Sequence, residues 1–227
     1  MQACNSCQAG CCRNFTVALT GFDLMNISKT LGVDLLSFIQ MVPVIGEENI
    51  AYRSEHSALF KFSDAADDNF YLFGMRMVES QLVPGTIKCQ FLQEWYLNIR
   101  KPSLETIISR CGIYNCRPLL CATYPTQFDS SEQHALIYNM DADPESVKHK
   151  IYNLCREKFK PEEVLATSDD IIQKLVLRKY EVDYFKNLAA SWNENPSTID
   201  DFLNLMIKTY NNRVVIKDYV KSASGHY

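Results

Sequence analysis

The chain has 227 residues, of which 47% are apolar and 22% are charged, and its formal net charge is −4. These values are typical of a globular protein with a substantial core. The slightly acidic balance argues against general binding to nucleic-acid phosphates, and no apolar run is long enough to predict a transmembrane helix. We therefore expect neither a nucleic-acid partner nor a membrane.

The first twelve residues contain a dense cysteine cluster. Its spacing is C-x2-C-x3-C-C, formed by Cys4, Cys7, Cys11 and Cys12. A short polar segment has no core in which free thiols could be buried, so this density favours coordination of zinc or iron by thiolates. A disulfide framework is typical of secreted chains with a signal peptide, and the residues before the cluster lack that pattern. We expect a metal site and a cytoplasmic location.

The segment that follows predicts a short strand and two helices. The strand is expected over residues 15–19. The first helix begins near Thr20 and ends at Gly32, with apolar side chains on one face. A second helix is expected over residues 35–42, with Asp34 as its N-cap and Pro43 as its stop.

The middle of the chain reads as strands separated by polar turns. Residues 50–53, 58–62 and 70–77 are rich in aromatic and β-branched side chains, which predicts an antiparallel meander. A strand over residues 86–92 carries Cys89, and a polar insertion is expected over residues 93–109. Further on we expect a strand over residues 134–140 and a helix over residues 143–159.

Residues 161–227 contain no cysteine and read as a helical appendage. Helices are expected over residues 168–192 and 199–210, each with an apolar stripe, while residues 213–220 fit either a strand or a helical tail. The expected fold class is therefore α+β. A cysteine-rich metal-binding domain with short antiparallel strands occupies residues 1–160, and the helical C-terminal part occupies residues 161–227.

A second cysteine-rich segment covers residues 111–125 and reads CGIYNCRPLLCATYP. Together with the first cluster and with Cys89 ahead of Phe91 and Leu92, this segment resembles the CxxCxxCC, or YkgJ-type, cysteine-cluster family of zinc- or iron-chelating proteins. That family includes the flagellin lysine N-methylase. The likeness covers about residues 1–125. Two differences are that three residues, rather than two, precede the Cys-Cys pair, and that Cys116 has no counterpart in the family pattern.

The resemblance implies a set of metal ligands drawn from both clusters. Cys155 is the candidate for a later cysteine that the family often has. Arg117 keeps its charge beside thiolates, so it either binds an anionic ligand or cofactor or offsets the thiolate charge. The implied metal ligands are Cys4, Cys7, Cys11, Cys12, Cys89, Cys111, Cys121 and Cys155.

Eight cysteines besides Cys116 leave the metal open. They suit two Cys4 iron–sulfur clusters, one cluster with a zinc ion, a single [4Fe–4S] cluster, or a single zinc ion with spare thiols. The bacterial ferredoxin run and the radical-SAM triad are both absent, and the four histidines stand alone in the sequence. Glycine-rich nucleotide loops and a nucleophile elbow are absent too, so no catalytic residue is assigned.

Three functions follow from these patterns. The first is an iron–sulfur protein with a redox or group-transfer role, for which the methylase relationship implies a protein lysine as substrate. The second is a non-enzymatic zinc- or iron-chelating module whose helical part docks a protein partner. The third is a thiol redox sensor that uses Cys11, Cys12 or Cys116. We favour metal binding, with iron ahead of zinc, and leave open whether the protein is an enzyme.

Overall fold

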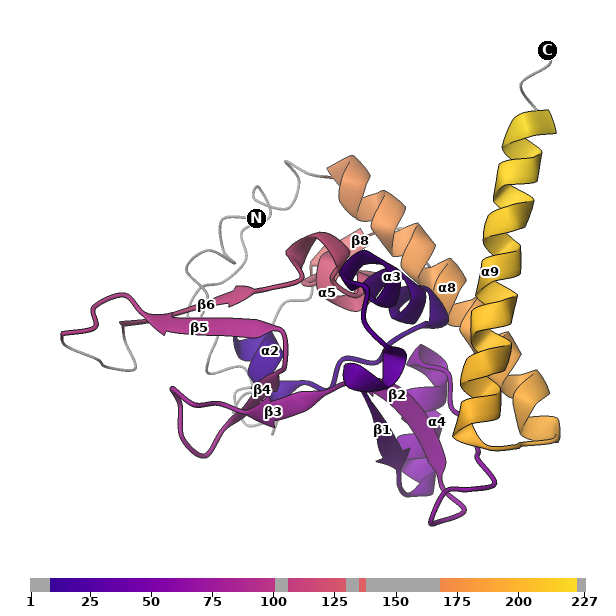
Figure 1. The fold of residues 1–227 in the computed structure, drawn as a ribbon, viewed down its shortest axis with the longest axis horizontal. Coiled ribbons are helices and arrows are strands. Elements are labelled where there is room, and N and C mark those ends of the chain that lie inside the picture. The colour runs from indigo at the N-terminus through magenta and orange to yellow at the C-terminus, as the bar shows by residue number, and fades with distance from the viewer. Residues whose placement is uncertain (1–8, 101–105, 130–134, 138–167, 224–227) are drawn as a thin grey trace. The chain divides into compact units, whose positions relative to one another are not determined.

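The structure is a computed structural model that describes residues 9–100, 106–129, 135–137 and 168–223. Within these ranges, helices are combined with short antiparallel strand pairs and followed by a helical C-terminal part (Figure 1). The predicted α+β class is therefore confirmed. No helix within the described ranges is long and apolar enough to cross a membrane.

The chain divides into two compact units, each assembled from separate stretches of sequence. Unit 1 comprises residues 1–17, 38–40 and 74–179, and unit 2 comprises residues 18–37, 41–73 and 180–227. The predicted boundary between residues 160 and 161 lies outside the described residues. Residues 18–37 and 41–73, which the sequence analysis places in the cysteine-rich domain, group with the C-terminal helices.

The described residues of unit 1 contain three antiparallel strand pairs. The first pair is β3 (Met77–Glu79) with β4 (Ile87–Cys89), the second is β5 (Leu92–Tyr96) with β6 (Ile107–Cys111), and the third is β7 (Thr126–Phe128) with β8 (Ala135–Ile137). The β5–β6 hairpin replaces the polar insertion predicted over residues 93–109, which was wrong. Of the strand predicted over residues 134–140, residues 135–137 are confirmed and the others lie outside the described residues.

Short helical segments carry the other described cysteines of unit 1. They are α2 (Gly10–Asn14), the 3-10 helix η3 (Tyr114–Cys116) and α5 (Leu119–Thr123). Pro118 separates η3 from α5, because it lacks the N–H that a continuous helix would need. The helix predicted over residues 143–159 lies outside the described residues.

Unit 2 begins with α3 (Gly21–Leu31), as predicted. Thr20 Oγ1 accepts a hydrogen bond from the Asp23 backbone N–H at 3.3 Å, and Asp23 Oδ2 accepts one from the Thr20 N–H at 2.9 Å. This capping box satisfies two donors at the helix start. Gly32 ends the helix at φ 66°, in the left-handed region that glycine adopts without steric cost.

The predictions for the next segments were mostly wrong. The helix expected over residues 35–42 is a single 3-10 turn, η1 (Leu35–Ser37), followed by the strand β1 (Ile39–Val44). β1 contains Pro43, and among the described strands it pairs with β2 (Phe70–Met75) alone, so the proline lies where an edge strand tolerates it. Residues 50–53, expected as a strand, lie in α4 (Glu47–His56).

Two predicted strands are reduced to isolated backbone contacts. Residues 15–19 donate and accept single hydrogen bonds with β2, for example from the Leu19 N–H to the Phe73 carbonyl at 2.8 Å. Residues 58–62 make one antiparallel bridge, between Phe60 and Tyr71. The expected meander therefore reduces to β2, which is confirmed, and this bridge.

The C-terminal helices are α8 (Ser168–Glu194) and α9 (Ile199–Ala223). Both predicted helices are confirmed, and residues 213–220 continue α9. Four phenylalanines with almost no exposed surface form the centre of unit 2, and the Phe60 and Phe202 ring centroids are 4.5 Å apart. Aromatic burial of this kind supplies much of the hydrophobic stabilisation of a small unit. The four are Phe60, Phe73, Phe185 and Phe202.

Candidate metal centre

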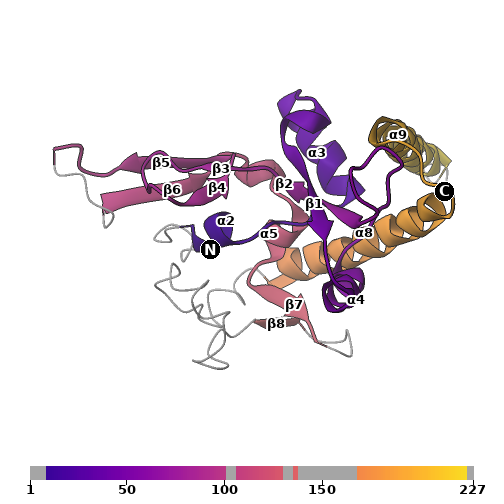
Figure 2. The same cartoon turned by 90° about the horizontal axis from the view of Figure 1, so that it is seen from below.

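All six described cysteines lie in unit 1, and none of them is part of a disulfide bond. Cys11 and Cys12 are on α2, which packs against β4, where Cys89 is the last residue. Cys111 ends β6, and Cys121 is on α5. Figures 1 and 2 show α2 beside these strands. The structure thus brings together segments about eighty to a hundred residues apart.

The sulfur atoms lie within electrostatic range of one another. Ionised Cys11, Cys89 and Cys121 each raise the pKa of Cys12. In the same way Cys111 and Cys11 raise the pKa of Cys89. Cys11 and Cys116 raise the pKa of Cys111. The described part of the predicted ligand set is therefore gathered in one place together with Cys116, whereas Cys4, Cys7 and Cys155 lie outside the described residues.

Burial and mutual repulsion oppose thiolate formation in this group. Contact with Cys11, whose Sγ is 3.9 Å from that of Cys12, and then burial raise the pKa of Cys12. Burial is the main cause that raises the pKa of Cys89 to about 11, and it also raises the pKa of Cys111. A coordinating cation reverses this balance, because it deprotonates a thiol outright. The chemistry of the group thus suits a bound metal better than free thiolates.

Two of the cysteines accept hydrogen bonds at sulfur from backbone N–H groups in the turns that follow them. The N–H groups of Phe91 and Leu92 lower the pKa of Cys89, and that of Ile113 lowers the pKa of Cys111, although burial outweighs both effects. In each turn an N–H two residues after the cysteine faces its sulfur. Hydrogen bonds to the charged form favour that form. The backbone of both turns is therefore set to stabilise a thiolate.

The two turns are joined to each other through a glycine. The Gly112 N–H donates to the Phe91 carbonyl at 2.8 Å, and Leu92 pairs with Cys111 in the hairpin register. A Cβ atom on residue 112 would lie only 2.9 Å from the Phe91 carbonyl oxygen. Only glycine therefore fits where the two cysteine turns meet.

Replacement of Gly112 by alanine is expected to separate the two turns and lower metal content. The steric conflict should also lower the free energy of unfolding by about 1–3 kcal/mol, as overpacking does. Gly85→Ala is the matched control: its φ of 75° imposes a cost of about 1–2 kcal/mol, but nothing lies within 4 Å of its Cβ position. Metal analysis and urea unfolding of both variants check this. Equal metal content in Gly112→Ala and wild type would contradict it.

The described cysteines suit a metal ion in their donor type but not in their arrangement. Among them, no set of three or more His, Cys, Asp or Glu side chains is arranged to hold an ion. The donor type does fit, because several soft sulfur ligands select zinc, copper(I) or iron–sulfur clusters. The described cysteines are therefore near one another without being in coordination geometry.

Arg117, the predicted cofactor-binding residue, lies beside the cysteines. Its guanidinium carbon is 4.1 Å from the centroid of the Tyr114 ring, a cation–π distance. Its charge lowers the pKa of Cys111, against the larger effect of burial. In this position the guanidinium favours the thiolate form of Cys111.

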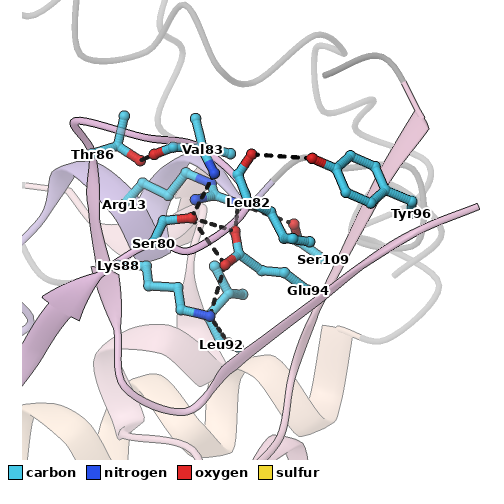
Figure 3. A network of polar contacts seen from close by, with 10 residues as sticks. All are labelled: Arg13, Ser80, Leu82, Val83, Thr86, Lys88, Leu92, Glu94, Tyr96 and Ser109. Atoms are coloured by element: carbon cyan, nitrogen blue, oxygen red, sulfur yellow. Dashed lines mark hydrogen bonds and ion pairs between the residues drawn. The ribbon is translucent and has the colours of Figure 1, made fainter. Parts of the chain in front are cut away.

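A buried ion-pair network around Glu94 is the feature that the sequence analysis missed (Figure 3). Glu94, whose side chain is 2% exposed, forms ion pairs with Arg13 and with Lys88, the latter at 2.7 Å. Burial alone would raise the pKa of Glu94, but the hydrogen bonds from Lys88 and Arg13 bring it below the ordinary value. One signal was available: Arg13 follows Cys12 directly, and Lys88 directly precedes Cys89.

Comparisons of the chain with protein-family models, with curated protein sequences and with solved structures give no match. The resemblance to the cysteine-cluster family therefore rests on the residues quoted above and stays a prediction.

Proposed function

We propose that this chain is a cysteine-ligated metal-binding protein whose cofactor is an iron–sulfur cluster, with a redox or group-transfer role. One observation carries the proposal: partly buried free cysteines from α2, β4, β6 and α5 lie within range of one another's charge. Gathering thiols from distant segments is costly in chain entropy, and coordination of a shared centre is the chemistry that rewards it.

The thiol redox sensor is less well supported. A sensor thiol is reactive because its pKa is lowered and it is exposed. Of the cysteines named for a sensor, Cys12 has a raised pKa, and the pKa values of the neighbouring Cys89 and Cys111 are raised as well. A raised pKa makes a thiol less nucleophilic at neutral pH. This favours metal ligation over thiol signalling.

Iron is proposed ahead of zinc, as in the sequence analysis, although the number of thiols suits either metal. A structural zinc site and a single iron–sulfur cluster each use four ligands, and the described group exceeds that number before Cys4 and Cys7 are counted. An iron–sulfur cluster would supply one-electron chemistry. The resemblance to the cysteine-cluster family makes a protein lysine a candidate substrate.

The alternative role is a non-enzymatic zinc- or iron-chelating module that docks a protein partner. The cytoplasm, where thiols stay reduced, is the proposed compartment.

The test is anaerobic purification followed by metal analysis, acid-labile sulfide analysis and visible absorption. Iron with an equivalent amount of sulfide supports the iron–sulfur assignment. A colourless protein with stoichiometric zinc supports the chelating module. Protein that holds neither metal, and takes up neither zinc nor iron with sulfide when reduced, would refute the proposed function.

The odd cysteine gives a prediction about the ligand set. Cys116 is 5% exposed, and its charge raises the pKa of Cys111. The family pattern has no cysteine at this position. We expect Cys116→Ser to keep full metal content, whereas Cys111→Ser and Cys121→Ser lose metal. Metal analysis of the three variants side by side measures this. Equal loss in all three would mean that this protein has a ligand set of its own.

A further inference from the structure

Glu94 contacts residues from each of the three segments that carry Cys11 with Cys12, Cys89 and Cys111. Its carboxylate pairs with Arg13 on α2 and with Lys88 on β4, and it accepts hydrogen bonds from the Ser80 hydroxyl at 3.1 and 3.3 Å. Arg13 also donates to the Ser109 hydroxyl on β6 at 3.3 Å. Ser109 is the register partner of Glu94. A single carboxylate thus links α2, β4 and the β5–β6 hairpin (Figure 3).

The contacts of Glu94 lie directly beside the thiols in sequence. Arg13 is adjacent to Cys12, Lys88 is adjacent to Cys89, and Ser109 is two residues before Cys111. Successive side chains of a strand point to opposite faces, so Lys88 and Cys89 leave β4 on opposite sides. The network therefore fixes the segments that bear the cysteines without using any sulfur atom.

The thiols themselves do little to hold their segments together. Burial and the charges of neighbouring cysteines oppose their ionisation, and neutral thiols are only weak hydrogen-bond partners, so other groups must fix the position of these segments. The ion pairs of Glu94 supply that constraint, and the buried charge pairs are hydrogen-bonded at both carboxylate oxygens, as a stable buried pair requires.

We propose that Glu94 is the positioning residue of the cysteine centre: it holds the thiol-bearing segments in register so that a metal meets thiols that are already near one another. This inference rests on the proposed function. It predicts an effect on metal affinity that is separate from the effect on folding, because outer-shell partners of metal ligands typically contribute about 10–100-fold in affinity.

The test compares Glu94→Gln with Glu181→Gln, a matched control that removes the charge of a buried, arginine-paired carboxylate in unit 2. Reduced, metal-free protein is titrated anaerobically with Zn²⁺ against a chromophoric chelator, and iron with sulfide is reconstituted in parallel. We expect Glu94→Gln to bind Zn²⁺ about 10–100-fold more weakly than wild type and to take up less iron, while Glu181→Gln stays within about threefold.

The outcomes separate this inference from the proposed function. If wild type binds Zn²⁺ or assembles a cluster and Glu94→Gln does so equally well, the positioning role is refuted. If Glu94→Gln and Glu181→Gln weaken binding equally, the effect is general destabilisation and the role is again refuted. Wild type that takes up neither metal refutes the proposed function itself.

Should Glu94→Gln fail to fold, Lys88→Met replaces it, since the Lys88 side chain is more exposed, at 15%. Removing this one contact is expected to weaken Zn²⁺ binding about three- to tenfold, and binding equal to wild type would refute the role.

Discussion

Replacement of Cys89 by serine is expected to lower bound metal and thermal stability together. Cys89 ends β4, lies against α2, and receives two backbone N–H groups that favour its thiolate. When ligands come from segments far apart in sequence, the free energy of metal binding is also free energy of folding, and structural zinc in small peptides supplies ~10–16 kcal/mol. Losing about 3–5 kcal/mol of it would lower the melting temperature by roughly 10 °C in a chain of this size.

The measurement is metal content and melting temperature of the same anaerobic preparation, for wild type and for Cys89→Ser. The control is the same pair after treatment with a chelator. Because serine is close to cysteine in size, the two metal-free proteins should melt at nearly the same temperature. A variant that keeps its metal would show that Cys89 is not a ligand, and a difference that persists after chelation would assign the loss to packing.

Sequence reasoning predicted elements whose signals are local. The helix from Gly21 to Leu31 has its capping box at Thr20 and Asp23 and its terminating Gly32 within the segment itself, so no distant contact is needed to identify it. The same holds for α8, which starts where Ser168 and two aspartates precede a long apolar stripe. Signals of this kind identify a helix without any knowledge of its tertiary contacts.

The errors occur where pairing with distant residues decides the conformation. Residues 35–42 were predicted as a helix because Asp34 resembles an N-cap, yet Asp34 caps only one 3-10 turn, where its Oδ1 accepts a hydrogen bond from the Leu36 N–H. Pairing with β2 then makes the following residues a strand. Helix and strand propensities differ by less than such tertiary contacts contribute. Residues 93–109 were misread for a related reason, since an exposed hairpin carries as many polar residues as a loop.

The residues of the candidate site also divide into those that a local pattern identifies and those that depend on distant contacts. The cysteines could be identified from the sequence because metal ligation depends on residue type and spacing. Glu94 could not, because a glutamate on a polar strand is ordinarily exposed. Its burial follows from the approach of Arg13 across 81 positions of sequence, which no local pattern encodes.

The buried ion pair of unit 2 gives the second large expected effect. Glu181 on α8, with a side chain 2% exposed, receives two hydrogen bonds from the Arg213 guanidinium, at 2.7 and 2.9 Å, and one from the Tyr210 hydroxyl at 3.2 Å. The guanidinium carbon lies 4.1 Å from the centroid of the Tyr184 ring. Arg213→Met is expected to lower the free energy of unfolding by about 3–5 kcal/mol, because it leaves a buried carboxylate without its counter-charge.

The double variant Arg213→Met/Glu181→Gln separates charge from packing. Glutamine removes the negative charge but keeps an acceptor for the Tyr210 hydroxyl, so the double variant is expected to recover most of the loss and to lie within about 1–2 kcal/mol of wild type. Urea unfolding of wild type, both single variants and the double variant gives the coupling energy directly. If the double variant is as unstable as Arg213→Met, the loss comes from the contacts of Arg213 with the tyrosine rings. If Arg213→Met costs less than about 1 kcal/mol, the pair behaves like an exposed salt bridge and the assigned role is wrong.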